Sequence, residues 1–195
     1  MQIPPDNCGG ASDEALLARF AAGDEMAARA LTARLTPRAY GHALRLLGGD
    51  TAEAEDVAQE AMLRLWRAAP GWRRGEARVS TWLYRVVANL CTDRWRKART
   101  VALGDVDEPP DSHPGAAARI VARQRTDALQ AALDALPARQ RQAVVLRHIE
   151  GLGNPEIARV MDISVAAVES LIARGRRALG ATLTGRRAEL GFEDE

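Results

Sequence analysis

The chain has 195 residues, a net charge of +1 and 47% apolar residues, of which few are aromatic. This length predicts one large domain or two small ones, with enough apolar residues for packed cores. No stretch approaches the roughly 20 apolar residues of a membrane span, the N-terminus does not resemble a signal peptide, and Cys8 and Cys91 give no disulfide framework. We therefore expect a cytoplasmic protein that does not insert into membranes.

The sequence pattern predicts an all-α fold, because the alternation typical of strands is nearly absent. After a disordered tail of residues 1–12, Ser12 is expected to cap a helix that ends at Gly23. Asp24 caps the next helix, which turns Met26, Ala30 and Leu31 inward. Thr36 and Pro37 should restart the chain as a separate helix, with Tyr40, Leu44 and Leu47 inward and its end at Gly48 and Gly49.

Residues 51–69 form a strongly amphipathic pattern, capped by Asp50 or Thr51 and ended by Pro70. The apolar stripe consists of Val57, Ala61, Met62, Leu65 and Trp66. The outward face is polar and contains Glu53, Asp56, Gln59, Glu60 and Arg64. Taken alone, such an acidic face is most often simply solvated.

Basic and aromatic residues are interleaved between Pro70 and Thr100, where eight basic residues stand against two acidic ones. A helix capped by Ser80 or Thr81 is expected there, with an apolar stripe of Leu83, Val86, Val87 and Leu90. Aromatic rings stack on single-stranded bases while guanidinium groups pair with phosphates. The alternative is that the tryptophans are core residues. We favour the core for Trp66 and nucleic-acid contact for Trp72 and Trp82.

A break in composition follows. Residues 101–118 contain four acidic residues and no Lys or Arg, together with prolines and glycines, which is typical of a linker. A second helical domain is expected beyond it. One helix has the stripe Leu129, Ala132, Leu133 and Leu136, and Pro137 begins another that packs Val144, Val145 and Ile149.

Residues 154–179 predict a helix-turn-helix. Asn154 is the expected N-cap of its first helix, whose inward residues are Ile157, Ala158, Val160 and Met161. Asp162 and Ile163 form the turn and Ser164 caps the second helix, with Val165, Val168, Leu171, Ile172, Gly175 and Leu179 inward. The outward residues are Ala166, Ala167, Glu169, Ser170, Ala173, Arg174, Arg176 and Arg177. Small residues permit close approach to base edges and arginines reach phosphates, although such helix pairs also occur in proteins that never bind DNA.

Three segments together resemble the extracytoplasmic-function (ECF) group of the bacterial sigma-70 family. AEDVAQEAMLRLWRA is similar to the region 2.2 motif, STWLYRVVANLCTDRWRK to regions 2.3 and 2.4, and residues 133–179 to region 4. The resemblance implies a polymerase-binding and DNA-melting domain at residues 13–97, an acidic linker at 98–118 and a −35-binding domain at 119–184, followed by a tail at 185–195.

The resemblance also implies a role for individual residues. Binding to core RNA polymerase falls to Asp56, Val57, Gln59, Glu60 and Arg64. Contact with −10 promoter DNA falls to Trp72, Arg73, Arg74, Arg78, Ser80, Trp82, Tyr84, Arg85 and Asn89. Contact with the −35 element falls to Ser164, Ala166, Ala167, Glu169, Ser170, Arg174, Arg176 and Arg177. Glu169 and Leu171 stand where relatives often have basic residues, so promoter preference does not transfer. An anti-sigma factor is a further implied partner.

No pattern in the chain indicates catalysis or a cofactor. We find no P-loop, no Ser/His/Asp set and no cluster of metal ligands, so we expect a transcription initiation factor that is not an enzyme and holds no metal. Two alternatives stay open at this point. One is a free-standing helix-turn-helix regulator with a ligand-sensing N-terminal domain. The other is a helical adaptor that binds only protein, which would leave the basic cluster at residues 73–99 without a role.

Overall fold

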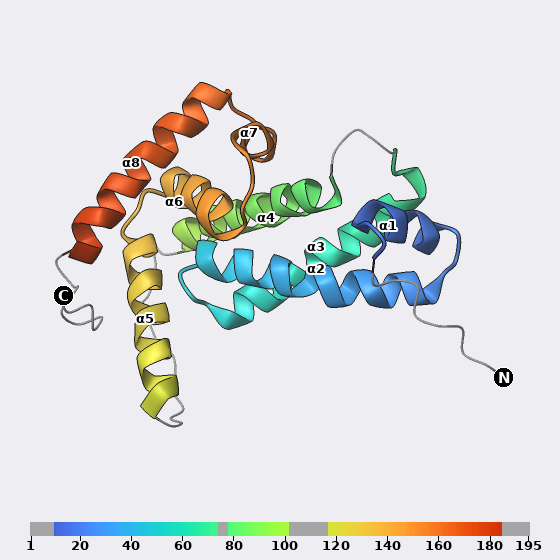
Figure 1. Ribbon diagram of the computed structural model, residues 1–195, viewed down its shortest axis with the longest axis horizontal. Helices are drawn as coiled ribbons and strands as arrows, with labels where there is room; N and C mark the ends of the chain where they lie inside the picture. Colours follow the sequence, from blue (N-terminus) through green and yellow to red (C-terminus); the bar gives the residue numbers. More distant parts are fainter. Residues whose placement is uncertain (1–9, 74–77, 102–116, 185–195) are drawn as a thin grey trace. The chain divides into compact units, whose positions relative to one another are not determined.

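The computed structural model describes residues 10–73, 78–101 and 117–184, and every regular element within those residues is helical (Figure 1). The all-α prediction is therefore confirmed. The contacts of the chain group it into two compact units, one from Met1–Leu44 and Asp50–Leu90, the other from Arg45–Gly49 and Cys91–Glu195. The predicted tails at 1–12 and 185–195 and the predicted linker lie largely outside the described residues.

The first unit is built from α1 (Asp13–Ala21), α2 (Glu25–Leu46), α3 (Thr51–Ala68), the short 3₁₀ turn η1 (Ala69–Gly71) and the start of α4 (Val79–Val101). Three of its helix starts match the sequence prediction. The Ser12 hydroxyl accepts from the Ala15 N–H at 3.2 Å, Asp24 Oδ1 from the Met26 N–H at 2.9 Å, and Asp50 Oδ1 from the Glu53 N–H at 2.9 Å. Each side chain satisfies an N–H that the first helical turn leaves without a partner.

The helices of the first unit bury one apolar stripe each. Fully buried side chains are Leu16 and Leu17 from α1, Leu31 and Leu35 from α2, Val57 and Leu65 from α3, and Val87 from α4. The expected restart at Thr36 and Pro37 is wrong, because α2 runs through Pro37 without interruption. A proline inside a helix costs about 3 kcal/mol, and the packing of Leu31 and Leu35 before it and of Ala39 after it offsets that cost.

The second unit contains the rest of α4, from Cys91 on, followed by α5 (Ala117–Asp134), α6 (Ala138–Val144), the π-helical turn η2 (Val145–Ile149), α7 (Asn154–Met161) and α8 (Val165–Thr184) (Figure 1). Its core cluster consists of Leu133, Leu136, Val144 and Val145, with Ile149, Ala178 and Leu179 packed against it. An ion pair of 2.8 Å between Arg141 and Asp134 connects α6 to α5. The predicted stripes of both helices before the helix-turn-helix are thus largely confirmed.

Three residues predicted to face inward are exposed, and one predicted N-cap is wrong. Met26, Leu129 and Val165 were expected inward, yet their side chains are 49%, 39% and 39% exposed. In each helix the inward positions are taken by neighbours three or four residues apart, such as Ala128 and Ala132 in α5. The N-cap of α7 is Gly153 rather than Asn154, and the Gly153 N–H donates to the Glu156 carboxylate at 3.0 Å.

Gly175 marks a close approach between α6 and α8. A Cβ added at this position would lie 2.6 Å from Cγ2 of Val144 and 3.4 Å from the carbonyl oxygen of Gln140. Val144 is buried and its β-branched side chain has little freedom at χ1. Glycine at residue 175 is therefore what allows α8 to lie directly on α6.

Candidate nucleic-acid and protein interfaces

The outward face of α3 carries the predicted acidic surface. Asp56 and Gln59 are exposed and Glu60 is half-buried. The Glu60 carboxylate accepts from Nε of Arg64 at 2.7 Å, and this hydrogen bond is the main reason that the pKa of Glu60 lies below its ordinary value. Val57 does not belong to this face. It is fully buried, so its predicted direct contact with a partner does not fit the structure.

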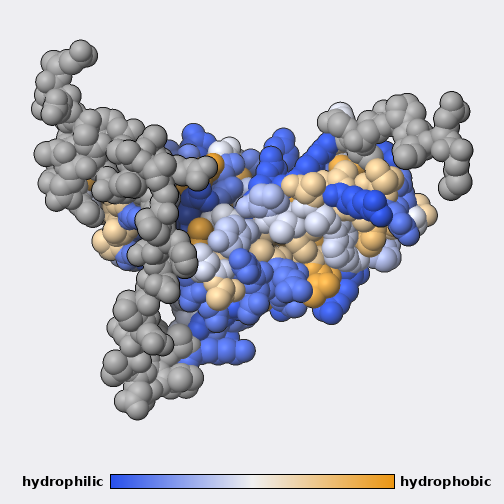
Figure 2. Space-filling model, turned by 90° about the horizontal axis from the view of Figure 1, so that it is seen from below, coloured by the Kyte–Doolittle hydropathy of each residue, from blue (hydrophilic) through white to orange (hydrophobic). Residues whose placement is uncertain are grey.

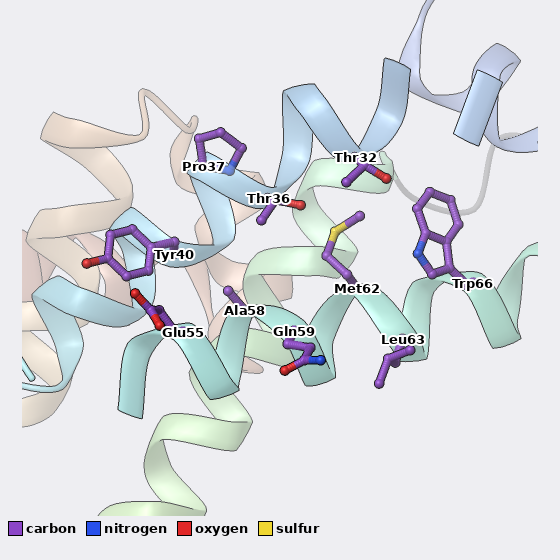
Figure 3. A pocket seen from close by; sticks show the side chains of 10 residues that line it. All are labelled: Thr32, Thr36, Pro37, Tyr40, Glu55, Ala58, Gln59, Met62, Leu63 and Trp66. Atoms are coloured by element: carbon purple, nitrogen blue, oxygen red, sulfur yellow. The ribbon is translucent and has the colours of Figure 1, made fainter. Parts of the chain in front are cut away.

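An apolar groove runs between α2 and α3, beside the acidic face. Its volume is about 730 Å³, and Figure 3 shows that the side chains lining it come from both helices. The lining residues are Thr32, Thr36, Pro37, Tyr40, Glu55, Ala58, Gln59, Met62, Leu63 and Trp66. Trp66 packs against Phe20 with ring centroids 4.5 Å apart but is only half-buried. It is therefore a wall of the groove rather than the core residue we had favoured.

Sequence reasoning missed this groove because it divided α3 into an inward stripe and an outward polar face. Leu63 was the available signal, as an apolar residue between the two, and its side chain is 42% exposed. Figure 2 shows apolar patches interrupted by hydrophilic residues on the face that it presents. An apolar hollow flanked by carboxylates is suited to side chains of a protein partner.

The start of α4 brings together several of the predicted −10 residues. Trp72 and Trp82 pack edge to face with centroids 5.8 Å apart. Both are half-buried, whereas Arg73 and Arg78 are exposed and Ser80 is half-buried. Arg85 and Asn89 are exposed four residues apart, so they share one side of the helix. Arg74 lies outside the described residues.

Tyr84 departs from the predicted −10 set. Its side chain is only 3% exposed, and its ring packs edge-on against the fully buried His42 with centroids 5.0 Å apart. A ring enclosed in this way cannot stack on a base, so the role predicted for Tyr84 does not fit its position. The residue belongs to the core of the first unit instead.

The expected cap of α4 is also wrong. Helix α4 begins at Val79, so Ser80 and Thr81 lie inside its first turn, and Thr81 Oγ1 is buried without a hydrogen-bond partner. The N–H of Val79 donates to the carboxylate of Glu14 in α1, at 3.1 Å. This pairing spans 65 residues of sequence. No local pattern could have predicted it.

Helices α7 and α8 form the predicted helix-turn-helix (Figure 1). Asp162 adopts the left-handed conformation at φ 53°, which Asp tolerates better than most residues. The Ser164 hydroxyl then accepts from the Ala167 N–H at 3.2 Å and caps α8. Ile157, Val160, Met161 and Val168 are buried between the helices.

The predicted outward face of α8 is solvent-exposed along its length. The exposed residues are Ser164, Ala166, Glu169, Ser170, Ala173, Arg174, Arg176 and Arg177, with Ala167 half-buried. Glu169 Oε1 accepts a hydrogen bond from Nδ2 of Asn154 at 3.4 Å, and Nε of Arg174 donates to the Ser170 carbonyl at 3.3 Å. The face thus has small residues and one carboxylate near its start and three arginines further along, the arrangement that suits a major groove.

Two further observations concern only the residues that the structure describes. No group of three or more His, Cys, Asp or Glu side chains is arranged to hold a metal ion among them. None of their helices combines the length and the hydropathy that a membrane span requires.

Two family models match this chain, and their ranges include most of the residues of these surfaces. Residues 31–101 match the sigma-70 region 2 family, and residues 126–179 match sigma-70 region 4. The first range contains the α2–α3 groove, the acidic face of α3 and the start of α4. The second contains α6, η2, α7 and most of α8.

Individual relatives agree with this assignment. The ECF RNA polymerase sigma factor SigM of Mycobacterium tuberculosis is 36% identical over 175 residues, which are 88% of this chain and 85% of SigM. The structure of CnrH in complex with the cytosolic domain of CnrY is similar with a TM-score of 0.63 and 29% identity, covering 89% of this chain and 97% of CnrH. The sigma factor RpoE of Bartonella quintana, solved with the anti-sigma factor NepR, shares the fold with a TM-score of 0.66 and 23% identity, over 78% of this chain and 94% of RpoE. The chain therefore belongs to the ECF group of the sigma-70 family, the non-enzymatic factors with which RNA polymerase recognises promoters and begins transcription.

Proposed function

We propose that this sigma factor divides its work among three separate helix faces. The acidic face of α3 binds core RNA polymerase, the start of α4 holds the melted −10 strand, and α8 reads the −35 element. The observation that carries the proposal is that, apart from the buried Val57 and Tyr84, the described members of each predicted set are exposed or half-buried. The acidic ones lie on α3, the basic and aromatic ones at and before the start of α4, and the arginines of the third set on α8. The domain limits at 13–97, 98–118 and 119–184 are part of this proposal.

Polymerase binding is assigned to Asp56, Gln59 and Glu60, with the Arg64 side chain holding Glu60 in place. The double variant Asp56→Arg, Glu60→Arg reverses the charge of this face without touching the core. We expect it to lose binding to core polymerase while its helicity is unchanged. An acidic face is complementary to a basic surface on its partner, and the two arginines would repel that surface. Glu25→Arg, an exposed acidic residue of α2, is the matched control. Equal binding by all three proteins would remove this assignment.

The −10 surface is assigned to Arg73, Arg78, Trp82, Arg85 and Asn89. Ring stacking contributes about 1–3 kcal/mol per base, so we expect Trp82→Ala to impair promoter melting by the holoenzyme much more than docking on the duplex. Permanganate footprinting of the −10 thymines measures melting directly. Equal footprints for the variant and the parent would exclude this role for Trp82.

The −35 surface is assigned to the outward face of α8. Arg174, Arg176 and Arg177 are expected to neutralise phosphates, so each change to alanine should weaken binding to all sequences and reduce the salt slope by about 1. Glu169 is expected to accept from cytosine N4 in the major groove. Glu169→Gln should therefore alter base preference at one position, which a randomised −35 library would detect. If the base preference were unchanged, Glu169 would have no role in reading the −35 element, and its hydrogen bond with Asn154 would be its structural role.

Regulation by an anti-sigma factor is a further part of the proposal, and the α2–α3 groove is the surface we assign to it. CnrH, which is 29% identical, was solved in complex with the cytosolic domain of CnrY. A protein that fills the groove would cover Gln59 at its edge and block polymerase. We place the sigma factor itself in the cytoplasm, where polymerase and promoter are found. Leu63→Arg, at the exposed wall of the groove, should weaken capture by such an inhibitor, which a polymerase competition assay would measure.

A further inference from the structure

The first turn of α4 forms a hydrogen bond with a residue near the beginning of the chain. Glu14, in the first turn of α1, accepts the N–H of Val79 at 3.1 Å. Val79 is the first residue of α4 and is fully buried. Helix α1 also contacts η1, the turn that precedes this region. The N-terminal helix therefore contacts the chain both at η1 and where α4 begins.

Glu14 is chemically suited to this position. The first N–H groups of a helix have no partner within it, and a negative charge at that end is favoured by the helix dipole. Burial by itself raises the pKa of Glu14, but hydrogen bonds from the Val79 N–H, its own backbone and Ser12, with the nearby charge of Arg78, hold that pKa below its ordinary value. The carboxylate is therefore charged at neutral pH and able to make a charge-assisted hydrogen bond.

The residues assigned to the −10 strand lie directly around this bond. Arg78 precedes Val79, and the carbonyl of Arg78 accepts the first hydrogen bond of α4, from the N–H of Trp82 at 3.1 Å. A shift of Val79 would therefore move Arg78 and Trp82 together. Trp82 would also lose its packing on Trp72.

We propose that Glu14 is a positioning residue for −10 recognition, which fixes the first turn of α4 so that Arg78 and Trp82 are held ready for the melted strand. The inference rests on the assignment of those two residues to the −10 strand. It gives α1, which precedes the matched region 2 segment at residues 31–101, a part in promoter opening without any contact between Glu14 and DNA.

The test compares three variants of the full chain. Glu14→Ala removes the acceptor, whereas Glu14→Gln keeps an oxygen at the same place without the charge. Asp13→Ala is the matched control, because Asp13 is the neighbouring acid of the same helix but pairs at 3.5 Å with Arg34 of α2. Each variant is assembled with core polymerase, and promoter opening is measured by permanganate together with binding of a −10 single strand.

We expect Glu14→Ala to lose about tenfold in strand binding and opening, the loss typical of one charge-assisted hydrogen bond. Glu14→Gln should recover only part of that loss, because it keeps the acceptor oxygen but not the charge, and Asp13→Ala should resemble the parent. All three should bind core polymerase and −35 duplex normally. Residue-resolved hydrogen exchange should show the Val79 amide exchanging faster in Glu14→Ala alone.

Two outcomes would overturn the inference. One is normal opening by Glu14→Ala despite faster exchange at Val79, which would make the bond a purely structural support. The other is an equal loss in Asp13→Ala, which would show general damage to α1. If instead the parent chain fails to bind the −10 strand, or Trp82→Ala binds it as well as the parent does, the proposed −10 surface is wrong and not the role of Glu14 alone.

Discussion

The two helices assigned to promoter DNA, α4 and α8, begin in opposite ways. Helix α8 is prepared locally, because Asp162 turns the chain and Ser164 caps the helix three residues before Ala167. Helix α4 receives its carboxylate from Glu14, in another helix and 65 residues earlier. The start of the −35 helix is thus specified by adjacent residues, while the start of the −10 helix depends on the packed fold of its unit. Substitutions that disturb the packing of a unit should therefore impair promoter melting, which we assign to α4, more than recognition of the −35 duplex, which we assign to α8.

The largest expected effect tests whether α8 depends on its support by α6. Gly175→Ala places a Cβ against Val144 and should destabilise the second unit by about 1–3 kcal/mol, with the loss of −35 binding. Gly180→Ala is the matched control, since nothing lies within 4 Å of its added Cβ. Thermal unfolding and duplex binding measure both. We expect −10 strand binding to be unchanged in Gly175→Ala, because α4 and α8 are assigned separate roles. Loss of that binding would contradict this separation.

The turn before α8 gives the next largest effect. Asp162→Val puts a β-branched residue at φ 53° and should cost about 1–2 kcal/mol. Asp162→Gly should be tolerated, because glycine adopts this conformation without strain. Denaturant titration of the two variants measures the difference. Equal stability would show that the turn is set by the packing of α7 and α8 rather than by its own residue.

Loss of the local cap should be smaller. Ser164→Ala should cost about 1 kcal/mol and Ser164→Thr much less, because threonine keeps the hydroxyl that accepts from the Ala167 N–H. Unfolding free energies of the two variants provide the measurement. Binding of a −10 single strand should not change in either variant, because Ser164 belongs to the proposed −35 surface, and a change would contradict that separation.

The smallest effect separates the two caps by pH. The folded pKa of Glu14 lies below its ordinary value of 4.5, so the stabilisation it provides is complete above about that pH and is lost as pH falls through the folded pKa. The Ser164 hydroxyl does not titrate in this range. Acidification should therefore expose the Val79 amide to exchange before the Ala167 amide, and Glu14→Gln should remove that difference in pH dependence. If acidification changed the exchange rates of the Val79 and Ala167 amides equally, this prediction would be contradicted.

Sequence reasoning succeeded where the cause of a structure is local. The caps at Ser12, Asp24, Asp50 and Ser164 were predictable because each acts within three residues of its own helix. The inward face of α7, and that of α3 apart from Trp66, followed from helical periodicity alone. The candidate surfaces on α3 and α8 were then predicted as the residues that remain on the outward side of each helix. Motif resemblance then supplied partners that periodicity could not.

Only the tertiary structure decided the features that join distant residues. Helix α2 continues through Pro37, Tyr84 is buried against His42, and a groove forms at Trp66 and Leu63. The tertiary structure also placed Glu14 at the start of α4. The physical reason is the same in each case, since burial and a long-range hydrogen bond depend on which side chains meet across helices, whereas a cap or an apolar stripe depends on residues a few positions apart.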